Sequence, residues 1–453
     1  MDKIYRKIIN DKVNIFIITS LLGIVLFLLW LVIIGDSQPV KWLVMEHNHD
    51  WQFSDFFRQI IYASDLKNIY FNTTDVPFPP LAYLIFNLIY RINPKEYDIS
   101  ALEWKKAAED NINMVIFIII ELINIIILYL IINKYLKKYN YKKSIAFYIC
   151  ILLSAPFLAG AIERGNTALF VLTLILVSLY YKDSVNKHKK HLSLILLAIA
   201  IGFKIYPIIF ILLWIKEKRY KEIKIFGIYF IIFVLLPFAF TGGIEGFFKY
   251  CDNLLINFSG KSVVLWTSIE GFYFSTCKAL NILAYSIVPM IIKYVFLIVN
   301  IGLAFLTKDK RKVLIPFAIL MAVFTSISYR YTSIYMLIPL LFIISSQNKE
   351  NKKIDIVYTI LFGMIFTIPV WAFWFEVDFA IYIMIFILDI IWIIESFKMI
   401  PKSLSPLTKW YQNLCPYRHW NFCLTNIYFC DILLSIIIFR RYIWTNQLEM
   451  QTD

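Results

Sequence analysis

The chain has 453 residues, of which 60% are hydrophobic and only 17% are charged, and its mean hydropathy is +0.69. Soluble globular proteins carry about 25% charged residues, so this composition excludes a water-soluble enzyme and a disordered chain. The formal net charge of +14 would suit a nucleic-acid partner, but the basic residues fall in clusters between apolar stretches. This distribution follows the positive-inside rule, so we expect a membrane protein that binds no nucleic acid.

Apolar runs that could cross about 30 Å of hydrocarbon occur along most of the chain. They are 13–34, 112–133, 145–161, 167–181, 224–240, 283–306, 313–328, 332–346, 354–374 and 379–397. No small-residue cleavage pattern follows the first run, so we expect it to remain as an anchor with a cytoplasmic N-terminus. Residues 35–111 then form a long outer loop.

The segment 193–215 is long enough for one crossing, yet basic clusters flank it at both ends. A single crossing would place one of these clusters outside and would reverse the side of the membrane expected for every later loop. Lys204 and Pro207 lie in its middle, and proline interrupts a helix. The sequence therefore predicts two short helices, 193–203 and 207–215, that go out and back with Lys204 at the tip.

The outer loop carries the first candidate acids. An amphipathic pattern predicts a surface helix near 53–62 that includes Asp55, and Asp75 follows before a short apolar helix at 81–90. For a single aspartate, a solvated surface or a helix cap is the more common role. His47, His49 and Asp50 could ligate a metal, but a hydrated loop is the simpler interpretation and no strong metal-ligand pattern is found.

Several cations are expected at the same outer face. The segment Glu163–Asn166 precedes the run 167–181, so Arg164 lies at a helix N-terminus, which is suited to anions. Lys204 lies at the hairpin tip, and Arg330 lies between two runs. Each could simply extend to lipid headgroups. Together with a carboxylate they predict a cavity that binds a phosphate beside a general base.

Such a cavity suits the transfer of a sugar from a lipid phosphate. The phosphate is already a good leaving group, so cations need only stabilise its developing charge. One carboxylate would deprotonate the attacking hydroxyl group. A glycosidase would instead need two carboxylates around the bond.

Five motifs follow one another along the chain: Ser54-Asp55-Phe56, Tyr62-Ala63, Pro79-Pro80-Leu81, Glu163-Arg164-Gly165-Asn166 and Gly202-Phe203-Lys204-Ile205-Tyr206-Pro207. Their order resembles that in the membrane glycosyltransferases of the GT-C superfold, and it is most similar to family GT87, whose members use polyprenol-phosphate-mannose. The resemblance implies that Asp55 is the general base and that Arg164 and Lys204 face the lipid phosphate. Asn166 and Arg330 would support phosphate binding, and Asp75, Glu163 and Tyr206 are candidates for the acceptor side or a second acid.

The expected fold is therefore an all-α polytopic, GT-C-like bundle of about 11–13 transmembrane helices. Its catalytic domain would span 1–397, and a tail at 398–453 has no assigned placement. The expected partners are the plasma-membrane bilayer, a polyprenyl-phosphate-linked sugar and a glycan or glycolipid acceptor at an extracytoplasmic active site. No cofactor is expected, and the sequence leaves open a divalent cation, the donor sugar, the acceptor and the oligomeric state.

Two other functions fit a polytopic chain with basic loops. A transporter or lipid flippase could use the helix broken near Lys204 as a midplane site, although no matching break is found in a second half of the chain. A polysaccharide polymerase is also polytopic with a large outer loop, but its main loop would be expected late in the chain.

Overall fold

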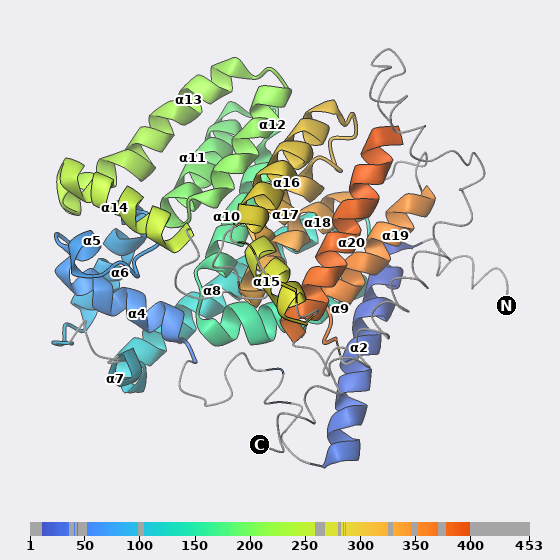
Figure 1. Ribbon diagram of the computed structural model, residues 1–453, viewed down its shortest axis with the longest axis horizontal. Helices are drawn as coiled ribbons and strands as arrows, with labels where there is room; N and C mark the ends of the chain where they lie inside the picture. Colours follow the sequence, from blue (N-terminus) through green and yellow to red (C-terminus); the bar gives the residue numbers. More distant parts are fainter. Residues whose placement is uncertain are drawn as a thin grey trace.

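The computed structural model describes residues 11–35, 40, 43, 52–97, 104–258, 268–279, 282–283, 285, 287–324, 329–346, 352–369 and 377–398. Every regular element in these ranges is a helix (Figure 1). The predictions for His47, His49 and Asp50 and for the tail beyond residue 398 lie outside the described residues.

The helices follow one another along the chain with short connections. They are α2 (Lys12–Ile34), α4 (Ser54–Tyr62), η1 (Ala63–Asp65), α5 (Ile69–Asn72), α6 (Pro80–Ile92), α7 (Trp104–Glu109), α8 (Asn111–Tyr135), α9 (Tyr141–Leu152), η2 (Phe157–Ile162), α10 (Ala168–Tyr181), α11 (Lys187–Phe203), η3 (Tyr206–Phe210), α12 (Ile211–Lys216), α13 (Tyr220–Phe230), η4 (Ile231–Leu235), η5 (Leu236–Phe240), α14 (Gly243–Phe258), α15 (Ile269–Ala279), α16 (Ile287–Leu306), α17 (Leu314–Val323), η6 (Arg330–Met336), α18 (Leu337–Ser345), α19 (Lys352–Ile365) and α20 (Val377–Lys398).

Among the residues that the structure describes, five helical segments are each long and apolar enough to cross a membrane, which confirms an all-α polytopic membrane protein. They are α2, α8, the stretch Tyr220–Phe240 formed by α13 with η4 and η5, α16, and Ala380–Lys398 within α20. Shorter apolar helices occupy other predicted runs. The run 145–161 is divided between α9 and η2, because Pro156 lacks the N–H group that would continue the α-helical hydrogen bonds.

The predicted cytoplasmic basic clusters meet at one end of the bundle, which we name the basic end. Ion pairs join Lys143 to Asp11, Lys12 to Asp355 (2.6 Å), Arg311 to Asp355 (3.2 Å), Lys310 to Glu217 (3.4 Å) and Lys182 to Glu217 (2.7 Å). Lys310 and Arg311 are neighbours in the sequence, so these pairs form one connected network. Segments far apart in the chain thus share one end.

The same network shows that the predicted hairpin goes out and back. Lys182 and Asp183 precede α11, and they pair with Glu217 and Arg219, which follow α12. The start and the end of this segment therefore lie together at the basic end. The helix breaks at Lys204, whose backbone is extended with φ −146° and ψ 131°. The prediction of two helices with Lys204 at the tip is confirmed.

The tip of this hairpin lies at the end of the bundle opposite the basic end. Helix α10 begins just after Asn166 and ends beside Lys182, and η6 with α18 leads from Tyr329 to Ser346, whose carbonyl accepts a hydrogen bond from Lys138 (3.0 Å). Asn166, Lys204 and Tyr329 are therefore gathered at one end. The short helices α4 to α7 lie together at one side in Figure 1, away from α2, α19 and α20.

Candidate active site

Asp55 lies in the first turn of α4, where the helix dipole favours a negative charge. The helix begins after Phe53, which adopts a left-handed conformation with φ 60°. The Phe53 N–H group donates a hydrogen bond to the Glu163 carbonyl (2.7 Å), and the Phe53 ring packs 4.8 Å from that of Phe117. The start of α4 is therefore attached directly to the segment that precedes α10.

Gly165 allows this segment to approach α4 closely. Its φ of +61° favours glycine, and a Cβ atom there would lie only 3.0 Å from Cβ of Phe56. The tight turn places its two neighbours on either side of the Asp55 carboxylate. Arg164 Nη2 donates to Asp55 Oδ1 (2.8 Å), and Asn166 Nδ2 donates to Oδ2 (2.6 Å).

The orientation of the Asn166 amide is fixed by a second contact. Its Oδ1 accepts a hydrogen bond from the Ala168 N–H group (2.9 Å), so its Nδ2 is left to face Asp55. The side chains of Arg164 and Asp55 are 5% and 15% exposed, so they form a buried charge pair. Each carboxylate oxygen accepts one of the two described bonds and has two lone pairs, which leaves Asp55 able to accept a proton.

Lys204 lies across the cavity from Asp55 and is surrounded by aromatic rings. Its Nζ lies 4.6 Å from the ring centre of Phe78, 5.2 Å from Tyr331 and 5.8 Å from Tyr206. Within the described part of the chain this ammonium group makes no hydrogen bond or ion pair. Burial lowers the pKa of Lys204 to about 8, and the charge of Asp55 opposes this shift. The aromatic faces stabilise the cation without neutralising it.

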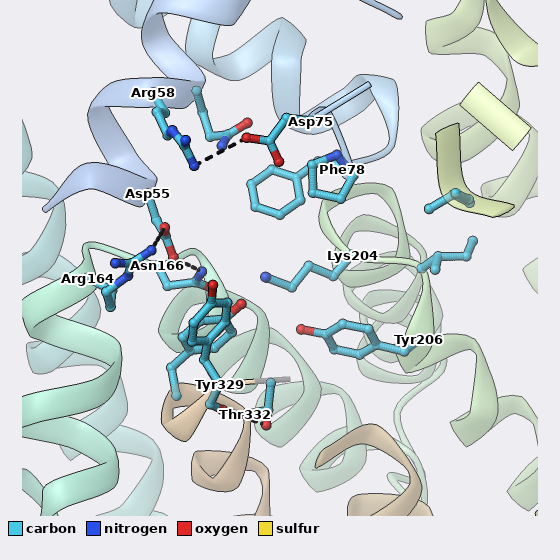
Figure 2. Close-up of a pocket in the computed structure, with 15 residues that line it drawn as sticks. Asp55, Arg58, Asp75, Phe78, Arg164, Asn166, Lys204, Tyr206, Tyr329 and Thr332 are labelled. Atoms are coloured by element: carbon cyan, nitrogen blue, oxygen red, sulfur yellow. Dashed lines mark hydrogen bonds and ion pairs between the residues drawn. The ribbon is translucent and has the colours of Figure 1, made fainter. Parts of the chain in front are cut away.

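Close packing explains how a lysine reaches this position. A Cβ atom on Gly202 would lie 2.6 Å from both Leu81 Cδ2 and the Phe233 carbonyl oxygen, so α11 packs directly against α6 and η4. Lys204 follows two residues later, where the helix has ended. Figure 2 shows its side chain extending toward Asn166.

Asp75 lies at the rim of the same cavity. It is 54% exposed, pairs with Arg58 (3.3 Å) and accepts a hydrogen bond from the Tyr62 hydroxyl group (3.3 Å). Burial, together with the negative charge of Asp75, raises the pKa of Tyr62 to about 12. Tyr62 therefore stays protonated and donates to Asp75 at physiological pH.

These side chains line one cavity of about 180 Å³. Its walls are formed by Asp55, Arg58, Gln59, Asp75, Pro77, Phe78, Arg164, Asn166, Lys204, Ile205, Tyr206, Leu254, Tyr329, Tyr331 and Thr332. Figure 2 shows Asp55 with Arg164 and Asn166 on one wall, the Arg58–Asp75 pair above them, and Lys204 with Tyr206 opposite.

Two candidates from the sequence do not line this cavity. Glu163 supports the site through its backbone carbonyl, which accepts the hydrogen bond from the Phe53 N–H group. Arg330 is 3% exposed, and its Nη1 donates to the Leu43 carbonyl, while its neighbours Tyr329 and Tyr331 line the wall. Conversely, Gln59 was missed by the sequence argument, although it lies four residues after Asp55 and so on the same helix face.

Among the residues that the structure describes, no three His, Cys, Asp or Glu side chains gather into a possible metal site. The cavity-lining residues offer two carboxylates, of which Asp55 is held by Arg164 and Asn166 and Asp75 by Arg58 and Tyr62.

A comparison with known protein families finds a matching family. Residues 109–328 match the family model described as glycosyltransferase family 87. Arg164, Asn166 and Lys204 lie inside the matched range, and Asp55 and Asp75 precede it. No curated protein and no solved structure matches the chain.

Proposed function

We propose that this chain is a member of glycosyltransferase family 87 and transfers a sugar from a polyprenyl-phosphate donor to a hydroxyl group of a glycan or glycolipid. Mannose is the first candidate for the sugar. The proposal rests on the observation that two charged groups face each other across one cavity. Asp55 is held by two hydrogen bonds on one wall, and the ammonium of Lys204 lies on the other.

Asp55 is the proposed general base. The acceptor hydroxyl group gives its proton to Asp55 while its oxygen attacks the anomeric carbon. The bond between that carbon and the phosphate oxygen breaks, and the electron pair leaves with the phosphate. Because the acceptor and the phosphate occupy opposite walls, the displacement inverts the configuration at the anomeric carbon.

Lys204 is the proposed partner of the departing phosphate. Among the cavity-lining residues that the structure describes, Arg58 pairs with Asp75 and Arg164 pairs with Asp55, whereas Lys204 has no anionic partner. A buried cation without a counter-ion attracts an anion strongly, because little water screens the interaction. Arg164 and Asn166 orient the base and add positive potential, and Tyr206 completes the wall beside Lys204.

The position of the cavity favours an extracytoplasmic site. The positive-inside rule assigns the basic end to the cytoplasm, so the cavity at the opposite end would face outward. A plasma-membrane location and an acceptor in the cell envelope follow from this orientation. Asp75, at the exposed rim, is then placed where an acceptor would enter.

Membership of a glycosyltransferase family argues against the transporter alternative. A polysaccharide polymerase remains the second candidate, and the length of the product separates the two. A transferase of the proposed type adds a single sugar to each acceptor, whereas a polymerase yields a ladder of products.

The test uses purified enzyme in lipid vesicles with a panel of polyprenyl-phosphate sugars and octyl glycosides as acceptors. Mass spectrometry of the products should show one added sugar, with inverted configuration, from one or a few donors. Absence of transfer from every polyprenyl-phosphate sugar, with transfer from nucleotide sugars instead, would overturn the proposal.

A further inference from the structure

Gln59 is a buried residue of the cavity wall, and the oxygen of its amide has no hydrogen-bond partner among the described residues. The residue is 5% exposed. A buried amide oxygen without a partner costs free energy, so a ligand that satisfies it would bind more tightly.

Two other buried amides near this site have a structural contact, although the Asn253 oxygen, which does not line the cavity, also has no hydrogen-bond partner within the described residues. Asn87 on α6 donates to the Ala63 carbonyl (2.6 Å), and Asn253 on α14 donates to the Tyr70 carbonyl (2.9 Å). These two amides hold the short helices together. Gln59 has no such described contact, so its polar group is not explained by packing.

The spacing relates Gln59 to the proposed base. Asp55 and Gln59 are four residues apart on α4, so their Cβ atoms are neighbours at about 5–6 Å on one face of the helix. Both line the cavity, and Lys204 lies across from this face. In an inverting displacement the acceptor approaches from the side opposite the phosphate, which is the side of α4.

We propose that Gln59 binds a second hydroxyl group of the acceptor, adjacent to the one that Asp55 deprotonates. The acceptor is then a sugar with neighbouring hydroxyl groups rather than an isolated alcohol. An amide both accepts and donates hydrogen bonds, as a hydroxyl group does, so the two are complementary. This inference rests on the proposed function, because it assumes that Asp55 activates the acceptor.

The test compares octyl mannoside with its monodeoxy analogues, using the donor with the highest turnover in the panel above. For the wild type, removal of the hydroxyl group next to the reacting one should lower kcat/KM about tenfold. The substitution Gln59→Met keeps the length of the side chain and removes the amide. It should raise the acceptor KM by a similar factor and abolish the discrimination against the deoxy acceptor.

Three measurements separate this inference from a general structural effect. In Gln59→Met the donor KM and the slow hydrolysis of the donor by water should match the wild type. The control Asn68→Leu, at an exposed amide in the same loop, should leave both acceptors unaffected. If Gln59→Met still discriminates against the deoxy acceptor, or if its donor KM rises instead, the inference is overturned while the proposed function stands. Wild-type enzyme that transfers no sugar from any polyprenyl-phosphate donor overturns the proposed function itself.

Discussion

Replacing Asp55 by asparagine tests the catalytic assignment most directly. The change keeps the size of the side chain and removes its charge and its ability to accept a proton. Loss of a general base lowers rates by about 10²–10⁴-fold. We therefore expect kcat to fall by this factor, with the KM for the donor changed much less because Lys204 is untouched.

The structure adds a second expected effect of Asp55→Asn, on stability. Arg164 would lose its counter-charge while its side chain stays 5% exposed. Breaking a buried pair in this way costs about 3–5 kcal/mol. The new amide could still accept a hydrogen bond from Arg164, but its NH2 group would then face that of Asn166, which cannot turn without losing its bond to Ala168. We expect a lower Tm together with the lower rate.

The assay measures sugar transfer by purified enzyme at saturating donor, with Tm recorded on the same samples. Asp65→Asn is the matched control, since Asp65 lies in the same loop, bonds to Asn68 and Asn72, and does not line the cavity. It should keep its transfer rate within about twofold of the wild type. An Asp55→Asn enzyme that retains more than a tenth of the wild-type kcat would refute the general-base argument.

Further predictions concern the cation, the turn and the topology. Lys204 is protonated below its pKa of about 8 and neutral above it, so donor affinity should fall by up to about tenfold per pH unit above that value. The variant Lys204→Arg should bind the donor with no such pH dependence, and a wild-type affinity that stays flat to pH 10 would contradict the assignment. The Gly165→Ala enzyme should lose sugar transfer, and its free energy of unfolding should fall by more than about 1–3 kcal/mol. Both the backbone strain at the positive φ and the close contact of the new Cβ atom with Phe56 destabilise this variant. Gly243→Ala, with the similar φ of +65° but open space around it, should lose less, and equal losses would refute the packing argument. A membrane-impermeant thiol reagent should label Asp75→Cys from outside the cell and Val185→Cys, which is 99% exposed beyond the other end of α10, only after the membrane is opened. The reverse pattern would invert the proposed orientation.

Charge and proline patterns were sufficient to predict the hairpin around Lys204. Two basic clusters flank this segment and must lie on the same side of the membrane, and Pro207 interrupts the helix between them. A hairpin satisfies both conditions, and the ion pair of Lys182 with Glu217 shows that its two ends lie together. The amphipathic helix that carries Asp55 was predicted from the spacing of apolar residues near 53–62. These features are local in sequence, so a pattern can reveal them.

Contacts between distant segments were not predictable. Of the three rings around Lys204, Phe78 and Tyr331 come from distant parts of the chain, and no periodicity relates them. Arg330 was expected in the site because it lies in the correct loop. Arg330 is the first residue of η6, and successive residues of a 3₁₀ helix point about 120° apart, so Arg330 does not share the face of Tyr331. The rings occupy the cavity wall, and the guanidinium group turns toward Leu43.

The aromatic surroundings of Lys204 have a consequence for the end of the catalytic cycle. If the donor is a polyprenyl-phosphate sugar, the spent lipid is a phosphate monoester with about 1.5–2 negative charges at pH 7, more than the diester that entered. The ammonium group of Lys204, which has no anionic partner among the described residues, would retain this product more tightly than the substrate. The spent lipid should therefore inhibit competitively with the donor, and its escape, rather than bond formation, would limit turnover between about pH 6, where the phosphate loses its second proton, and about pH 8, where Lys204 loses its own.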